Sequence, residues 1–185
     1  MMRLGQHFMI DRRGLQKVVD AARLGTEDRV LEIGSGKGAL TELIATKCSV
    51  TTIEKDKELF NYLTEKFPEV EILNQDALKA DWPHFDKCVS NLPYLISKKF
   101  TIKLLKHDFE LAVIVVQKEF AEKLAAKPGE KNYGVVSVCA QLCCDVELLD
   151  TLPKNAFKPQ PKVESQIVRL TQKQKLDNGF LNFVT

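Results

Sequence analysis

The sequence predicts an α/β fold in which a mostly parallel, seven-stranded sheet carries helices on both faces. Short apolar, β-branched segments alternate with segments of helical periodicity along most of the chain, as expected of βαβ units. Residues 111–116 are apolar throughout and fit a central strand that is buried on both sides. Polar side chains follow four of the strands, at the edge where open α/β sheets bind ligands.

The elements of the first half follow from periodicity. Residues 14–24 place apolar side chains at i, i+3, i+4 and i+7, which predicts an amphipathic helix. Residues 29–33 form a β-branched strand that stops at glycines, and residues 39–47 return to helical spacing. We predict the next elements as a strand at 49–53, a helix at 57–66 and a strand at 71–74.

The second half continues the alternation. We predict a strand at 87–91, a helix at 98–106, a strand at 110–117, a helix at 118–126, a loop at 127–132 and a helix at 134–144. Two further strands, 146–151 and 165–171, flank a proline-rich connection. Parallel strands joined through helices wind right-handed into an open sheet, and residues 1–171 are expected to form this single domain.

Length and composition exclude several classes of protein. The 185 residues suit one domain, and no apolar run approaches the roughly 20 residues that span a bilayer. The amino end lacks the apolar region of a signal peptide, so we expect a cytoplasmic protein with no membrane partner. The five cysteines lack the spacing and histidine partners of a zinc site. We therefore expect reduced, mostly buried thiols and no metal.

A glycine-rich turn follows the strand at 29–33 and opens a helix. Gly34, Gly36 and Gly38 can adopt tight backbone conformations that let a ligand approach the main chain. With Ala39 the turn also matches the dinucleotide fingerprint, and Glu54 lies about 20 residues beyond Gly34, where a ribose-binding acid belongs. The turn thus fits a nicotinamide dinucleotide, S-adenosylmethionine, or a purely structural role.

Acidic residues at the strand ends favour S-adenosylmethionine. This molecule is a cation without phosphates, so a pocket lined by Glu32, Glu54 and Asp76 attracts it and repels a pyrophosphate. Asp76 can accept from an adenine amino group while the backbone of Ala77 faces the ring edge, although a solvated loop acid remains the alternative. A nicotinamide oxidoreductase is disfavoured because its cofactor carries the pyrophosphate that such an acidic pocket repels.

The segment Asn91-Leu92-Pro93-Tyr94 is the most specific in the chain. An exocyclic adenine amine is a poor nucleophile, and the Asn91 amide oxygen and the Leu92 carbonyl are two acceptors that can orient it. Pro93 restricts Leu92 to extended conformations, and Tyr94 offers a flat face for an extruded base. A simple turn after a strand is the structural alternative.

Five segments resemble the KsgA-type small-subunit rRNA adenine dimethyltransferases. They are LGQHFMID (4–11), EIGSGKGALT (32–41), NLPY (91–94), QKE (117–119) and FKPQPKVES (157–165). The resemblance covers nearly the whole chain. It implies a Rossmann-like, class I S-adenosylmethionine-dependent methyltransferase fold that dimethylates the N6 amino group of adenines in small-subunit (16S-type) rRNA during ribosome biogenesis.

The resemblance also implies site residues. Those expected at the cofactor are Gln6 and His7 at its methionine end, Gly34, Gly36, Glu54 at the ribose, Lys55, Asp76 and Ala77 at the adenine, and Asn91. Those expected at the target amine and ring are Asn91, Leu92, Tyr94 and Phe157. Core packing is an equal alternative for Phe157. Many relatives carry asparagine in place of His7.

The expected partner is small-subunit rRNA or a pre-30S-type ribosomal subunit, bound by a monomer. Basic residues expected near the mouth are Arg12, Arg13, Lys98, Lys99, Lys118, Lys127, Lys131, Lys158 and Lys162. Family members continue into a helical domain, so residues 172–185 are expected to be a linker and the start of a truncated C-terminal domain. Two alternatives stay open: an RNA-binding assembly checkpoint with incidental methylation, and a large-subunit rRNA adenine dimethyltransferase.

Overall fold

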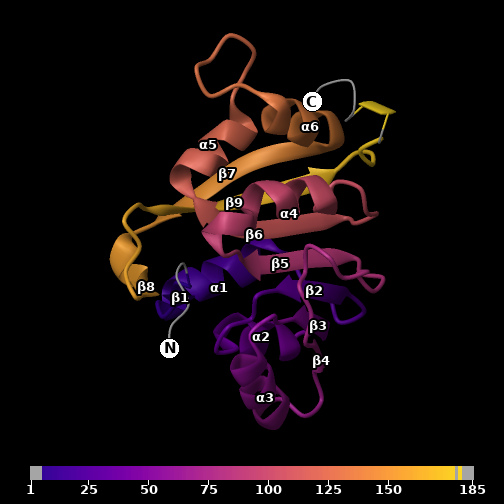
Figure 1. Cartoon of the computed structure of the whole chain (residues 1–185), viewed down its shortest axis with the longest axis vertical. Helices are drawn as coiled ribbons and strands as arrows, with labels where there is room; N and C mark the ends of the chain where they lie inside the picture. Colours follow the sequence, from indigo (N-terminus) through magenta and orange to yellow (C-terminus); the bar gives the residue numbers. More distant parts are fainter. Residues whose placement is uncertain (1–5, 178, 181–185) are drawn as a thin grey trace.

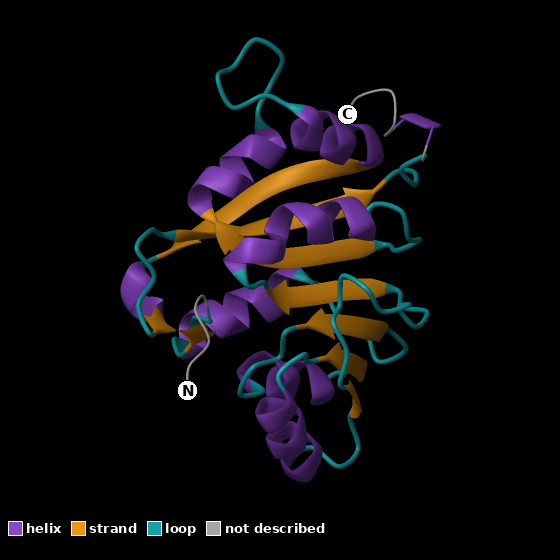
Figure 2. Cartoon of the chain, in the orientation of Figure 1, coloured by secondary structure: helices purple, strands orange, loops and turns teal. Residues whose placement is uncertain are grey.

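A computed structural model of the chain describes residues 6–177 and 179–180. Its main sheet has seven strands in the order β4-β3-β2-β5-β6-β9-β7 (Figures 1 and 2). The five parallel strands are β2 (Arg29–Ile33), β3 (Ser49–Ile53), β4 (Glu71–Leu73), β5 (Lys87–Asn91) and β6 (Leu111–Gln117). Strand β9 (Ser165–Gln172) runs antiparallel between β6 and β7 (Cys144–Leu152). The mostly parallel, seven-stranded sheet expected from the sequence is confirmed.

Helices cover both faces of this sheet (Figure 2). The helices are α1 (Arg12–Ala21), α2 (Ala39–Ala45), α3 (Lys57–Lys66), α4 (Ser97–Leu104), α5 (Lys118–Ala125) and α6 (Val135–Cys143). Apolar residues of α1 and α2 form one core cluster, and those of α4, α5 and α6 form the other. Strand β6 divides its side chains between them, with Ile114 on the α4 face and Val113 on the α1 face. This alternation explains why the strand is apolar at every position.

Strands β2 and β5 lie side by side at the point where the strand order reverses. Their pairing covers only Val30 with Lys87 and Leu31 with Cys88, after which the two strands part. The buried Ser90 hydroxyl bridges the gap by accepting from the Ile33 backbone N–H at 2.9 Å. The carboxyl edge of the sheet therefore opens where ligand sites of this fold lie.

The N-terminal segment is tied to the proline-rich connection far along the chain. Strand β1 (Phe8–Met9) pairs antiparallel with β8 (Phe157–Lys158), and the Ile10 N–H donates to the Ala156 carbonyl at 2.8 Å. A short 3-10 turn, η2 (Lys154–Ala156), precedes β8. After β1 the chain enters α1. The Asp11 carboxylate caps the start of this helix by accepting from two backbone N–H groups. Helix α1 thus begins two residues before the predicted start at 14.

The boundary between α6 and β7 also differs from the prediction. Cys144, predicted as the end of a helix, is the first residue of β7, which bulges between Leu148 and Thr151. Four of the five cysteines are buried as expected, and Cys139 and Cys143 lie on the packed face of α6.

Packing of this domain continues past residue 171. Leu176 is buried, and its N–H donates to the Leu105 carbonyl at 2.7 Å. Residues 178 and 181–185 of the predicted C-terminal segment lie outside the described residues. Across the described ranges, no helix is long and apolar enough to cross a membrane.

Candidate active site

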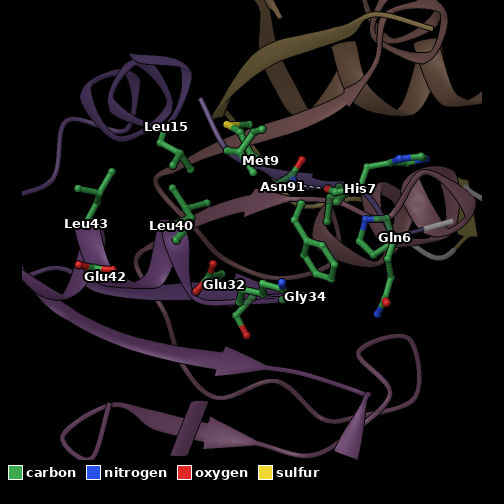
Figure 3. Close-up of a pocket in the computed structure, with 18 of the residues that line it drawn as sticks. Gln6, His7, Met9, Leu15, Glu32, Gly34, Leu40, Glu42, Leu43 and Asn91 are labelled. Atoms are coloured by element: carbon green, nitrogen blue, oxygen red, sulfur yellow. Dashed lines mark hydrogen bonds between the residues drawn. The ribbon is translucent and has the colours of Figure 1, made fainter. Parts of the chain in front are cut away.

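A cavity of about 600 Å³ opens at the carboxyl edge of the sheet (Figure 3). The N-terminal segment, α1, the glycine turn, α2 and the ends of β3 and β5 contribute to its walls. Its volume falls within the roughly 300–1,000 Å³ of small-molecule sites. Of the site residues that the family resemblance implies, eight line it: Gln6, His7, Gly34, Gly36, Glu54, Asn91, Leu92 and Tyr94. The predicted pocket acid Glu32 lines it as well.

The glycine turn has the backbone geometry that the sequence indicated. Gly36 has φ +58° and Gly38 has φ +78°, both in the left-handed region. A Cβ atom on Gly38 would lie 2.4 Å from the Phe67 ring, so α3 packs directly on this backbone. The turn therefore needs glycine for its conformation and for the close approach of α3.

Glu54 holds the turn against the end of β3. One carboxylate oxygen accepts from the Gly36 N–H at 3.0 Å, and the other accepts from the Asp56 N–H at 2.8 Å. Burial raises the pKa of Glu54, and these two backbone hydrogen bonds act in the opposite direction. Each oxygen keeps a second lone pair, which can accept from a ligand hydroxyl in the cavity.

Two further polar groups lie in the wall next to the turn. The Ser35 hydroxyl is buried and has no hydrogen-bond partner among the described residues. Glu32 is 1% exposed and accepts from the Thr41 hydroxyl at 2.6 Å. Burial raises the pKa of Glu32 to about 8, so this side chain is protonated near neutral pH. The sequence predicted a carboxylate anion at this position. A cation bound nearby would favour that charged form, because opposite charge lowers the pKa of a carboxyl.

The residues predicted at the adenine lie beside Glu54 and outside the cavity lining. Lys55 donates to Asp76 at 2.9 Å, and this contact lowers the pKa of the Asp76 carboxyl. The Ala77 carbonyl accepts from the Trp82 indole at 2.8 Å and from Lys103 at 2.9 Å. No described residue accepts from the Ala77 N–H. The loop is therefore fixed through its carbonyl and keeps one backbone donor for a ligand.

Asn91 is oriented by the N-terminal segment. Its Nδ2 donates to the His7 carbonyl at 3.1 Å, which directs Oδ1 the other way (Figure 3). Among the described residues, none donates to Asn91 Oδ1 or to the Leu92 carbonyl. The cavity thus borders two acceptors on adjacent residues, the arrangement that the sequence predicted for an amino group.

Tyr94 is anchored at both ends. Its hydroxyl lies 2.6 Å from the Ser165 hydroxyl, and its ring centroid lies 5.3 Å from that of His7. Burial raises the pKa of the Tyr94 phenol. The His7 ring is held in turn by a hydrogen bond from its Nδ1 to the Pro159 carbonyl at 2.8 Å. These contacts fix the aromatic ring at the cavity wall.

Phe157 lies elsewhere. It is the first residue of β8, and its side chain is 1% exposed because it packs into the core. It does not line the cavity. The structure thus supports its packing role, and contact with a base stays a prediction. Of the basic residues, Arg12 lines the cavity, whereas Lys127 and Lys131 follow the far end of α5.

The structure adds a wall that sequence reasoning missed. Leu15 from α1 and Leu40 and Leu43 from α2 line one end of the cavity (Figure 3), together with Met9. Helical periodicity indicated that the helix residues face inward, but only the packing of α1 on α2 places them at a cavity. Met9 was predictable, because it lies in the same motif, residues 4–11, as Gln6 and His7.

Comparison with known proteins places these features in a family. The family model described as ribosomal RNA adenine dimethylase matches residues 1–184. A protein of Pyrococcus abyssi named "Probable ribosomal RNA small subunit methyltransferase A" is 43% identical over 175 residues, which is 93% of this chain and 65% of that protein. A protein of the same name from Methanosarcina barkeri is 42% identical over 97% of this chain. The chain thus spans about two thirds of the length of these curated relatives.

Solved structures agree with the sequence comparison. A dimethyladenosine transferase from Plasmodium falciparum superposes with a TM-score of 0.86 and 35% identity, covering 90% of this chain and 64% of that one. The 23S rRNA methyltransferase ErmE superposes with a TM-score of 0.82 and 31% identity, covering 95% of this chain and 75% of that one. The predicted Rossmann-like methyltransferase fold is confirmed.

Proposed function

This chain belongs to the ribosomal RNA adenine dimethylase family, and on that basis we propose that it transfers methyl groups from S-adenosylmethionine to the N6 amino group of adenines in small-subunit rRNA. The product is dimethyladenosine, formed during ribosome biogenesis. The observation that carries the proposal is the pair of unclaimed acceptors, Asn91 Oδ1 and the Leu92 carbonyl, at the wall of the cavity.

The residues around the glycine turn fit S-adenosylmethionine. When bound, this cofactor supplies an electrophilic methyl group on a positively charged sulfur. The Ser35 hydroxyl is a buried polar group that a ligand can satisfy, and Glu54 has spare lone pairs for ribose hydroxyls. We assign the methionine end to Gln6, His7 and Gly34, and the adenine to Asp76 and Ala77, with Lys55 holding Asp76 in place.

The substrate side works by orientation. Two N–H bonds of the amine donate to Asn91 Oδ1 and to the Leu92 carbonyl, so its lone pair faces away from both acceptors. The same acceptors would stabilise the amine as it becomes cationic, so no general base would be required before the methyl group is transferred. The sulfur would leave as a neutral thioether, and the methylated amine would then release its extra proton to water. The Tyr94 ring provides a stacking surface, which is worth about 1–3 kcal/mol per base. Orientation and electrostatics together supply the catalysis.

Replacement of Asn91 tests this proposal. Asn91→Ala removes one acceptor and leaves the glycine turn intact, but it also removes the donor to the His7 carbonyl. We therefore expect methyl transfer to fall by about a hundredfold, while binding of S-adenosylmethionine is retained with an affinity loss of less than about tenfold. Tritium transfer to small-subunit rRNA and calorimetry with the cofactor measure the two quantities. Unchanged transfer would contradict the role given to Asn91.

A second target has a specific observation in its favour, namely the structural similarity to the 23S rRNA methyltransferase ErmE. The higher identity to the small-subunit relatives supports the first target. Mapping methylated nucleotides after incubation with both rRNAs distinguishes them. We further propose that the chain acts in the cytoplasm as a monomer on a ribosomal subunit.

A further inference from the structure

The exposed side chain of Leu95 has no role in the site described so far. It is 82% exposed, the highest value among the large apolar side chains of the described residues. It directly follows Tyr94, which lines the cavity, but it does not itself line the cavity. Leu95 is therefore the chain neighbour of a residue that we place at the target base, and its side chain is exposed to solvent outside the cavity lining.

The backbone beneath Leu95 is firmly held. Residues Tyr94–Ile96 form the 3-10 turn η1, closed by a hydrogen bond from the Ile96 N–H to the Pro93 carbonyl at 3.0 Å. Helix α4 follows without a break and is anchored by the fully buried Phe100 and Leu104. The hydrogen bond of Tyr94 to Ser165 fixes the other side. A rigid support thus presents an apolar side chain to solvent.

Two cations lie one helical turn beyond Leu95. Lys98 and Lys99 are exposed, at i+3 and i+4 from Leu95, so all three side chains project from neighbouring positions of one helical surface. Neither lysine forms an ion pair with any residue that the structure describes. An apolar tip flanked by unpaired cations matches a nucleic acid strand, which offers base faces and phosphates together.

We propose that Leu95 is a wedge that enters the base stack of the RNA substrate and occupies the space left by the extruded adenine, while Lys98 and Lys99 contact the adjacent phosphates. This inference rests on the proposed function. An adenine in structured RNA must leave its stack to reach Asn91, and unstacking costs a few kcal/mol. Proteins that open base steps commonly insert an apolar side chain between them. Leu95 is thus a positioning residue for structured substrates.

The test compares two RNAs with the same sequence around the target adenine. In a hairpin the adenine is stacked within a helix, and in an unstructured strand it is free. We expect Leu95→Ala to lower methyl transfer about tenfold or more on the hairpin, and by less than about twofold on the strand, since only the hairpin has a stack to open. Leu95→Met keeps an apolar tip and retains transfer on both.

The matched control is Leu142→Ala, which removes an exposed leucine from α6, away from the mouth, and leaves transfer on both RNAs unchanged. Equal loss on both RNAs in Leu95→Ala would overturn the wedge, because it would place Leu95 in the catalytic pocket. No loss on either RNA would overturn it as well. Leu95 is so exposed that its replacement leaves folding intact, which thermal unfolding verifies.

A fluorescence measurement separates this inference from the proposed function. A 2-aminopurine placed next to the target adenine in the hairpin brightens when the stack opens. We expect brightening with the wild type and with Asn91→Ala, and none with Leu95→Ala. If the wild type binds the hairpin without brightening, the wedge is refuted even where methyl transfer occurs. If brightening occurs without methyl transfer from S-adenosylmethionine, the proposed function fails and the wedge stands.

Discussion

Replacing Glu32 with glutamine should change how the stability of the protein depends on pH. Glu32 is fully buried, and its pKa rises from an ordinary value of 4.5 to about 8 in the folded chain. Between these values the folded chain holds a proton that the unfolded chain has lost. The contribution of Glu32 to the free energy of unfolding is therefore fully present below pH 4.5, declines as the pH rises, and is lost above pH 8. Glutamine can still accept from Thr41 but does not titrate.

The magnitude follows from the shift. Each pH unit within the window costs the wild type about 1.4 kcal/mol relative to Glu32→Gln, so the variant should gain about 3 kcal/mol over the wild type between pH 5 and pH 7. Urea unfolding of both proteins at several pH values measures this difference.

The control is Glu42→Gln on α2, where the wild-type side chain is 62% exposed. This variant makes the same change from carboxyl to amide at an exposed position, so it should follow the wild-type profile. Parallel profiles for Glu32→Gln and the wild type would refute the reasoning, because they would mean that Glu32 ionises in the folded chain as it does in water.

Three further substitutions test the geometry of the site. Gly38→Ala forces an unfavourable φ and a clash with Phe67. It should therefore lower the free energy of unfolding by at least about 2 kcal/mol in urea titrations. A variant as stable as the wild type would show that α3 can move away. Tyr94→Phe keeps the ring and loses the bond to Ser165, so the rate of methyl transfer should fall only a few-fold. Tyr94→Ala also loses the stacking energy, so its rate should fall about 10- to 100-fold. Equal rates for the two variants would exclude stacking. Ser90→Ala leaves the buried Ile33 N–H of β2 without its acceptor. It should lower the free energy of unfolding by about 1–3 kcal/mol in the same titration. An unchanged free energy would mean that β2 and β5 move together and pair directly.

Much of the fold could be predicted from the sequence because short, strongly patterned segments have few alternatives. Strands β2, β3 and β5 and helix α3 have the predicted boundaries. Each of these strands is a short run ended by residues that the turn requires, such as Gly34 after β2. Strands β1 and β8 were missed because two residues carry no measurable periodicity. The antiparallel insertion of β9 between β6 and β7 depends on long-range pairing that no local pattern contains.

The site divides in the same way. Gly34, Glu54 and Asn91 were predictable because the ends of parallel strands meet at one edge of the sheet. The protonation of Glu32 was not, since it depends on how completely α2 buries the carboxyl. The core position of Phe157 was also not decided by sequence, because an aromatic residue between prolines fits a wall or a core equally well.

The link between the two ends of the chain has a consequence for biosynthesis. His7 and Ile10 reach their places only by bonding to Pro159 and Ala156, about 150 residues later. Until those residues leave the ribosomal tunnel, a nascent chain has no partner for its first strand and no fixed amide at Asn91. Ligand capture during translation should therefore begin abruptly, once residues up to about 160 have emerged.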